Sequence, residues 1–193
     1  GAPMNPPDLL GLIQSKEIIT RIKSVQSTSP TILSLIGGII SELGNRLLST
    51  FNEVSSDCLE VALTLLQSED ETIAETVLPF LKSCALSKTD ASAQPDVLQA
   101  LFRRYVMYFD QEPLELNDFS EEILKIILKV QMMNSELFEG FVQQACSVAS
   151  GETLGLIAAL LHIMQHVRSK NFNQPLIEAF SFLLESVPVP CER

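Results

Sequence analysis

Apolar residues recur at three- and four-residue steps through almost the whole chain, and windows of strict alternation are nearly absent. This spacing is typical of one face of an α-helix, whereas a half-buried strand alternates every second residue. The pattern predicts about nine helices, which begin near positions 9, 31, 57, 70, 95, 120, 135, 153 and 175. We therefore expect an all-α fold.

Several residues indicate where these helices begin, bend or pack closely. Asp8 is expected to cap the first helix, and Pro95 suits the first turn of the fifth. Pro79 lies inside the fourth helix, where it removes a backbone hydrogen bond and is expected to cause a kink. Gly37 and Gly38 lie inside the second helix. Because interior glycines cost about 1 kcal/mol each relative to alanine, we expect a neighbouring helix to approach closely there.

The helices follow one another at a regular distance in the sequence. The expected starts are about 21 residues apart on average, so a helix pair recurs roughly every 40 to 45 residues, as in HEAT and armadillo repeats. One helix pair cannot bury its apolar face alone, but stacked pairs form a continuous core. We expect a HEAT- or armadillo-like α-solenoid of stacked antiparallel helix pairs. A compact, non-repetitive helical bundle is the alternative.

The two ends of the chain bear on its organisation. Residues 1–3 precede Met4 and resemble a scar left by protease cleavage, whereas residues 4–193 are expected to form a single helical repeat domain. We expect this domain to be a fragment of a longer protein. No run reaches the roughly 18 to 20 uninterrupted apolar residues of a membrane helix, and no basic segment precedes an apolar one at the N-terminus. Membrane insertion and secretion are therefore not expected.

Charge and cysteine content limit the function classes. The chain has 24 acidic and 13 basic residues, which gives a net charge of −11. This charge repels phosphate backbones, so direct nucleic-acid binding is not expected. The four cysteines match neither a metal-binding CxxC pair nor a small disulfide scaffold, and we expect reduced, mostly packed thiols in an intracellular protein. They are Cys58, Cys84, Cys146 and Cys191.

The sequence offers little support for catalysis. His162 and His166 are spaced to face one metal ion on a helix, but an HExxH site requires glutamate where Ile163 stands. No third ligand is near in sequence, so we interpret both as ordinary helix histidines. The chain contains no GxSxG, Walker or GxGxxG motif. We predict no enzyme activity, no cofactor and no metal.

Basic residues occur in small groups that we interpret as solvated helix faces. These groups are Lys16 with Arg21 and Lys23, Arg103 with Arg104, and Arg168 with Lys170.

An acidic strip stands out between the fifth and sixth predicted helices. It holds six carboxylates and no lysine or arginine within residues 110–122. One interpretation is a solvated connector whose last carboxylates stabilise the N-terminus of the next helix. The other is a docking strip for a basic protein surface. The candidate binding residues are Asp110, Glu112, Glu115, Asp118, Glu121 and Glu122.

Two segments carry a family resemblance. Residues 35–44 read LIGGIISELG, and residues 63–81 read LTLLQSEDETIAETVLPFL, in which an acidic turn separates two apolar helices. This order resembles a middle repeat of the karyopherin-β nuclear transport receptors, and the helix at 154–167 is similar to the pattern of that family. The exportin-T-like and transportin-like branches are the most similar.

The resemblance implies a flexible HEAT-repeat superhelix that binds the GTPase Ran and a cargo and moves between nucleus and cytoplasm. Exportin-T-like receptors carry transfer RNA, but the acidity of this chain departs from an RNA-binding surface. The acidic strip resembles acidic loops that some receptors place near Ran or basic cargo. We therefore predict a protein-binding α-solenoid fragment of a nuclear transport receptor. The alternative is a HEAT-repeat scaffold subunit of a large intracellular complex unrelated to transport.

Overall fold

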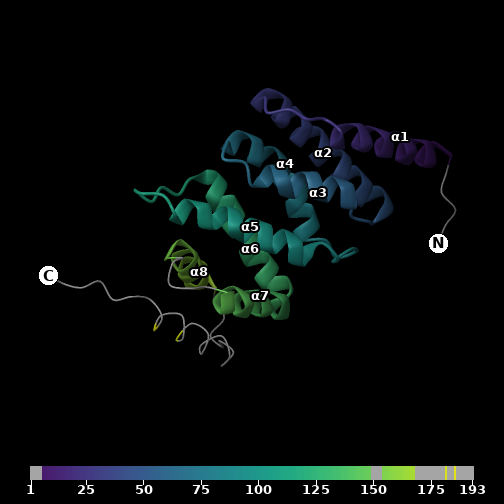
Figure 1. The fold of residues 1–193 in the computed structure, drawn as a ribbon. Coiled ribbons are helices and arrows are strands. Elements are labelled where there is room, and N and C mark those ends of the chain that lie inside the picture. Colours follow the sequence, from purple (N-terminus) through teal and green to yellow (C-terminus); the bar gives the residue numbers. More distant parts are fainter. Residues whose placement is uncertain (1–5, 149–153, 168–180, 182–184, 186–193) are drawn as a thin grey trace. The chain divides into compact units, whose positions relative to one another are not determined.

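A computed structural model describes residues 6–148, 154–167, 181 and 185, and this part of the chain is helical with no strand (Figure 1). Its helices begin within three residues of the first eight predicted starts, which confirms the all-α prediction. The ninth predicted helix lies outside the described residues, apart from 181 and 185. The eight helices are α1 (Pro6–Lys23), α2 (Pro30–Phe51), α3 (Ser56–Leu66), α4 (Glu71–Ala85), α5 (Gln94–Phe109), α6 (Asp118–Met133), α7 (Ser135–Val148) and α8 (Leu154–His166).

The chain divides into two compact units within α5. The first unit comprises Gly1–Ala100, and the second comprises Leu101–Arg193. The expected single domain over residues 4–193 stays a prediction.

Short polar side chains begin several of these helices. Ser55 Oγ accepts a hydrogen bond from the Cys58 backbone N–H at 3.3 Å at the start of α3. Asp70 Oδ1 accepts one from the Thr72 N–H at 3.0 Å at the start of α4. Such caps satisfy N–H groups that have no partner within the helix. The expected cap at Asp8 is wrong, because α1 already begins at Pro6.

Alternate helices are neighbours in the first unit. Helix α2 packs most extensively against α4, and α1 packs against α3, while each of α1, α2 and α3 also contacts the next helix along the chain. This is the pattern of stacked helix pairs, in which each pair buries its apolar face against the next. The packing is consistent with the expected α-solenoid.

Glycine permits the close contact between α2 and α4. A Cβ added to Gly37 would collide with Thr76, and a Cβ added to Gly44 would lie 2.5 to 2.8 Å from ring atoms of Phe80. Gly38 has no such neighbour within 4 Å and is exposed. The predicted close approach is therefore confirmed at Gly37 and wrong at Gly38.

Pro79 lies inside α4 without ending the helix, which continues to Ala85. The next residue, Phe80, donates its backbone N–H to Ser41 Oγ of α2 at 3.0 Å, and this hydrogen bond is buried. The expected kink at Pro79 stays a prediction.

In the second unit, α6 packs against both α7 and α8. The side chains of Ile123, Ile127 and Val130 on α6 are fully buried. Phe102 of α5 meets Phe141 of α7 edge to face, with ring centroids 5.1 Å apart. These contacts give the second unit an apolar core of its own.

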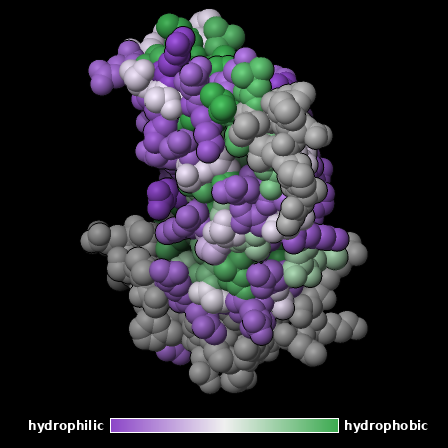
Figure 2. Space-filling view, turned by 90° about the vertical axis from the view of Figure 1, so that its right-hand side faces the viewer, coloured by the Kyte–Doolittle hydropathy of each residue, from purple (hydrophilic) through white to green (hydrophobic). Residues whose placement is uncertain are grey.

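Some apolar side chains remain on the surface of α1 and α2. Figure 2 shows hydrophobic patches among polar ones at the upper end, where these two helices lie in Figure 1. Ile32, Leu35 and Ile39 of α2 are 43%, 62% and 43% exposed. By length and composition alone, α2 is the one described helix that could cross a membrane. A core helix passes the same test, and the opposite face of α2 packs against α4.

Candidate functional site

The acidic strip, residues 110–122, covers the connector between α5 and α6 and the start of α6. Asp110, Glu112 and Glu115 lie in the connector, whereas the other three acidic residues lie on α6. All six acidic residues that the sequence analysis selected are exposed. The strip therefore presents its carboxylates to solvent.

The N-terminus of α6 is capped by an amide rather than by a carboxylate. Asn117 Oδ1 accepts a hydrogen bond from the Ser120 N–H at 2.9 Å, and Ser120 Oγ accepts one from the Asn117 N–H at 2.8 Å. This reciprocal capping box satisfies two backbone donors. Asp118 and Glu121 occupy the first turn, where the helix dipole favours negative charge. Asn117 was not among the predicted caps, although an asparagine just before an apolar helical run is a known cap signal.

Few cations neutralise the strip within the described residues. Glu122 Oε1 lies 3.2 Å from Nζ of Lys125, and no ion pair joins any of the other five carboxylates to a described lysine or arginine. The pKa of Lys125 is raised, first by its hydrogen bond to Glu122 and then by the charges of Glu122, Glu121 and Asp118. These carboxylates therefore favour an ammonium group at this end of the strip.

Two apolar side chains are exposed among the acidic ones. Leu114 is 51% exposed and Leu116 is 42% exposed, and Glu115 stands between them. An exposed leucine alone needs no explanation, but two leucines flanked by carboxylates form a surface that can bind both apolar and basic groups.

Asp110 also has a structural neighbour. A Cβ added to Gly155, in the first turn of α8, would collide with the Asp110 carboxylate. The carboxylate therefore lies at the N-terminal end of α8, where negative charge is favourable.

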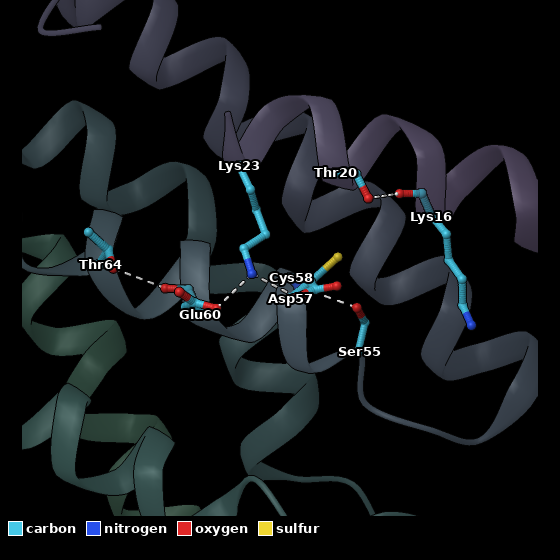
Figure 3. A network of polar contacts seen from close by, with 8 residues as sticks. All are labelled: Lys16, Thr20, Lys23, Ser55, Asp57, Cys58, Glu60 and Thr64. Atoms are coloured by element: carbon cyan, nitrogen blue, oxygen red, sulfur yellow. Dashed lines mark hydrogen bonds and ion pairs between the residues drawn. The ribbon is translucent and has the colours of Figure 1, made fainter. Parts of the chain in front are cut away.

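A polar network joins α1 to α3 in the first unit (Figure 3). Lys23 Nζ lies 2.8 Å from Asp57 Oδ1 and 2.9 Å from Glu60 Oε2. These two hydrogen bonds are the largest causes of the raised pKa of Lys23. Lys23 lies on an exposed helix face, as predicted, and the two ion pairs to α3 add a structural role to it. Its partners lie 34 and 37 residues away, so no local pattern could indicate the pairs.

A cavity of about 510 Å³ lies beside this network. Its volume is in the range of small-ligand sites. Lys16 and Glu53 both border it, so charges of both signs line it and favour no single class of ligand. The lining residues are Leu12, Lys16, Ile19, Thr20, Leu47, Phe51, Glu53, Val54, Ser55, Ser56 and Asp57.

The prediction that the basic groups are solvated is wrong for Arg104. Arg103 is exposed as expected, but Arg104 is only 4% exposed. Its guanidinium carbon lies 5.6 Å from the ring centroid of Tyr108 and 5.7 Å from that of Phe119. Cation–π contacts therefore replace solvent around this side chain. Arg168 and Lys170 lie outside the described residues.

The histidine pair lies on α8, but a tyrosine is its nearest polar partner. Tyr105 Oη lies 2.7 Å from His162 Nδ1, and His166 Nδ1 lies 2.9 Å from the carbonyl oxygen of His162. Among the described residues, no group of three or more His, Cys, Asp or Glu side chains could hold a metal ion.

The described cysteines are packed thiols. Cys58 and Cys84 are free and fully buried. Burial raises the pKa of both, to about 12 for Cys84. The side chain of Cys146 in α7 lies outside the described part, as does Cys191.

Comparison of the chain with protein families, curated proteins and solved structures found no match.

Proposed function

We propose that this chain is a protein-binding helical-repeat segment and that the acidic strip binds a basic segment of a partner protein. The observation that carries the proposal is the exposure of all six carboxylates, with an ion pair to a described cation only at Glu122. Exposed carboxylates of one sign attract a cationic partner and guide its approach. The net charge of −11 adds to this attraction at long range.

The exposed leucines narrow the chemistry of the partner. Leu114 and Leu116 alternate with Glu115 in the connector, so a matching segment would present apolar side chains beside lysine or arginine. The apolar contacts would supply affinity that salt does not screen, whereas the ion pairs would supply orientation and association rate. We therefore expect a basic amphipathic segment rather than a purely cationic tail.

Nuclear transport is the specific form of this proposal that the family resemblance suggests. In that form the partner is Ran in its GTP state or a basic cargo, and the protein works in the nucleus and cytoplasm. The longer protein that contains this chain would retain Ran when GTP is bound and release it when GDP is bound. Retention of Ran that is equal with GTP and GDP would contradict the transport role. It would not contradict the proposal that the acidic strip binds a basic protein.

A scaffold role in a large intracellular complex is the alternative form. It uses the same strip, but its partner is a permanent subunit and not a nucleotide-controlled one. The flanking sequence separates the two forms, because a Ran-binding repeat upstream would favour transport, whereas unrelated domains would favour a scaffold.

Mapping a basic peptide on the protein tests the binding proposal directly. The probe is a short peptide that alternates leucine with lysine, and the control peptide replaces each lysine with glutamine. Backbone amide signals of residues 110–122 should shift on titration with the first peptide and not with the second. Shifts confined to the exposed apolar residues of α1 and α2 would contradict the proposed site.

A further inference from the structure

His162 of α8 faces two aromatic side chains of α5. Its ring centroid lies 6.0 Å from that of Tyr105 and 5.5 Å from that of Phe109. The short contact between Tyr105 Oη and His162 Nδ1, 2.7 Å, is the polar link in this otherwise aromatic contact. The proposed binding function does not use this cluster.

The Tyr105 hydroxyl depends on His162 for a partner. The Tyr105 side chain is 1% exposed, and in the described part of the chain His162 Nδ1 is its hydrogen-bond partner. Burial raises the pKa of Tyr105 to about 12, so the phenol keeps its proton at neutral pH. A neutral imidazole that carries its proton on Nε2 accepts this phenol proton at Nδ1.

Protonation of His162 would reverse that hydrogen bond. Both nitrogens of an imidazolium are donors, so Nδ1–H would point at Tyr105 Oη and the phenol proton would lose its acceptor. A buried donor without an acceptor is unfavourable, because it has given up its hydrogen bond to water. The half-buried imidazolium would also lose part of its own hydration.

The charged groups around His162 do not offset the unfavourable free energy of protonating it. Its ring centroid lies 4.9 Å from that of His166, so two imidazolium rings would repel each other. Asp110, the acid that follows α5, lies against Gly155, seven residues before His162. Helix α6 also packs against α8, but none of its charged side chains has an ion pair or hydrogen bond to His162. The pKa of His162 is accordingly lowered, first by burial and then by His166.

We propose that the contact between Tyr105 and His162 is a pH-sensitive latch that holds α8 against α5 at neutral pH and weakens on acidification. The lowered pKa gives the sign: the folded state binds this proton less readily than the unfolded chain, whose histidine has its ordinary value of 6.5. The stabilisation is therefore complete above pH 6.5 and is lost as the pH falls from there through the folded-state pKa.

Hydrogen exchange of the full chain at about pH 7.5 and about pH 5.5 tests the latch. The readout is the protection factor of α8 amides, corrected for the intrinsic pH dependence of exchange and compared with that of α4. Protection of α8 should fall severalfold at the lower pH while that of α4 stays constant. Equal changes in both helices, or no change in α8, would overturn the proposal.

Three variants separate the latch from general destabilisation. His162→Asn places an amide group near the position of Nδ1 without a titrating ring, so α8 should stay protected at both pH values. His166→Gln removes the repulsion and keeps the hydrogen bond, so the pH response should persist with smaller amplitude. Tyr105→Phe should lower protection at pH 7.5 and weaken the pH response. A full pH response in His162→Asn would overturn the proposal, because the titrating group would then lie elsewhere.

Discussion

The backbone N–H of Phe80 donates a buried hydrogen bond to Ser41 Oγ over 3.0 Å, at the contact between α4 and α2. Phe80 follows Pro79, which has no N–H and so cannot donate a helical hydrogen bond at its own position. Ser41 stands between Gly37 and Gly44 on the same buried face of α2. The contact between α2 and α4 therefore combines close backbone approach with one hydrogen bond that a backbone N–H of α4 donates to a serine hydroxyl of α2.

Removing the Ser41 hydroxyl should leave the Phe80 N–H without its acceptor on α2. We expect Ser41→Ala to lower the free energy of unfolding by about 1 to 3 kcal/mol, as for other buried groups that lose a partner. Ser49→Ala is the matched control, because Ser49 is exposed at the end of the same helix, and it should change stability by less than about 0.5 kcal/mol. Urea unfolding followed by circular dichroism gives both values. Equal losses in the two variants would contradict the role of Ser41.

The glycines of α2 should respond to alanine in opposite directions. Gly38→Ala adds a methyl group in open space and should stabilise the helix by up to about 1 kcal/mol. Gly37→Ala and Gly44→Ala force Thr76 and the Phe80 ring to move, and each should destabilise by about 1 to 3 kcal/mol. Thermal unfolding of the three variants tests this order. Stabilisation by Gly44→Ala would show that α4 can shift at little cost.

The helices could be predicted from sequence because they depend on local spacing. The three- and four-residue apolar steps located the eight described helices within three residues, and Gly37 indicated a close helix contact. The partner of that contact was not predictable. Which side chain of α4 meets Gly37 or Gly44 depends on how two helices 30 to 40 residues apart are stacked, and a single sequence does not record this.

The candidate site was predictable in composition but not in its contacts. Counting acids located the strip, and its exposure fits a connector rich in carboxylates, although the exposure of Leu114 and Leu116 within it was not predicted. The contact of Asp110 with Gly155 and the burial of Arg104 between aromatic rings both depend on tertiary packing. The rule that basic groups on helices are solvated fails at Arg104 because Tyr108 and Phe119 flank its guanidinium.

The buried thiols should react slowly in the folded protein. Only the thiolate is a strong nucleophile, and burial keeps the pKa of Cys84 near 12 and raises that of Cys58. At about pH 8, iodoacetamide should alkylate Cys58 and Cys84 at least about tenfold more slowly in the native protein than in urea. Peptide mass spectrometry measures each site separately. Equal rates in the native and unfolded chains would contradict the burial of these residues.

The same pKa shift predicts loss of stability in alkali. Because the folded-state pKa of Cys84 is about 12 and its ordinary value is 9.0, its contribution is complete below pH 9 and falls as the pH rises from 9 to about 12. The free energy of unfolding should therefore decrease over this range. Cys84→Ala should show a shallower decrease, whatever its stability at neutral pH. An unchanged slope in that variant would assign the effect to other groups, among them Tyr105.

Charge reversal in the acidic strip, with binding measured as a function of salt concentration, tests whether the strip binds a basic partner. The variant combines Glu112→Lys, Glu115→Lys and Asp118→Lys, and the control makes the same change at the exposed Glu17, Glu69 and Glu75. Both should keep the helical circular dichroism of the parent. The basic amphipathic peptide should bind the strip variant about tenfold more weakly than the control at low salt, a difference of about 1.4 kcal/mol. The difference should shrink near 1 M salt, where the Debye length is about 3 Å. Equal affinity of the peptide for both variants at every salt concentration would contradict the proposal that the acidic strip is the binding site.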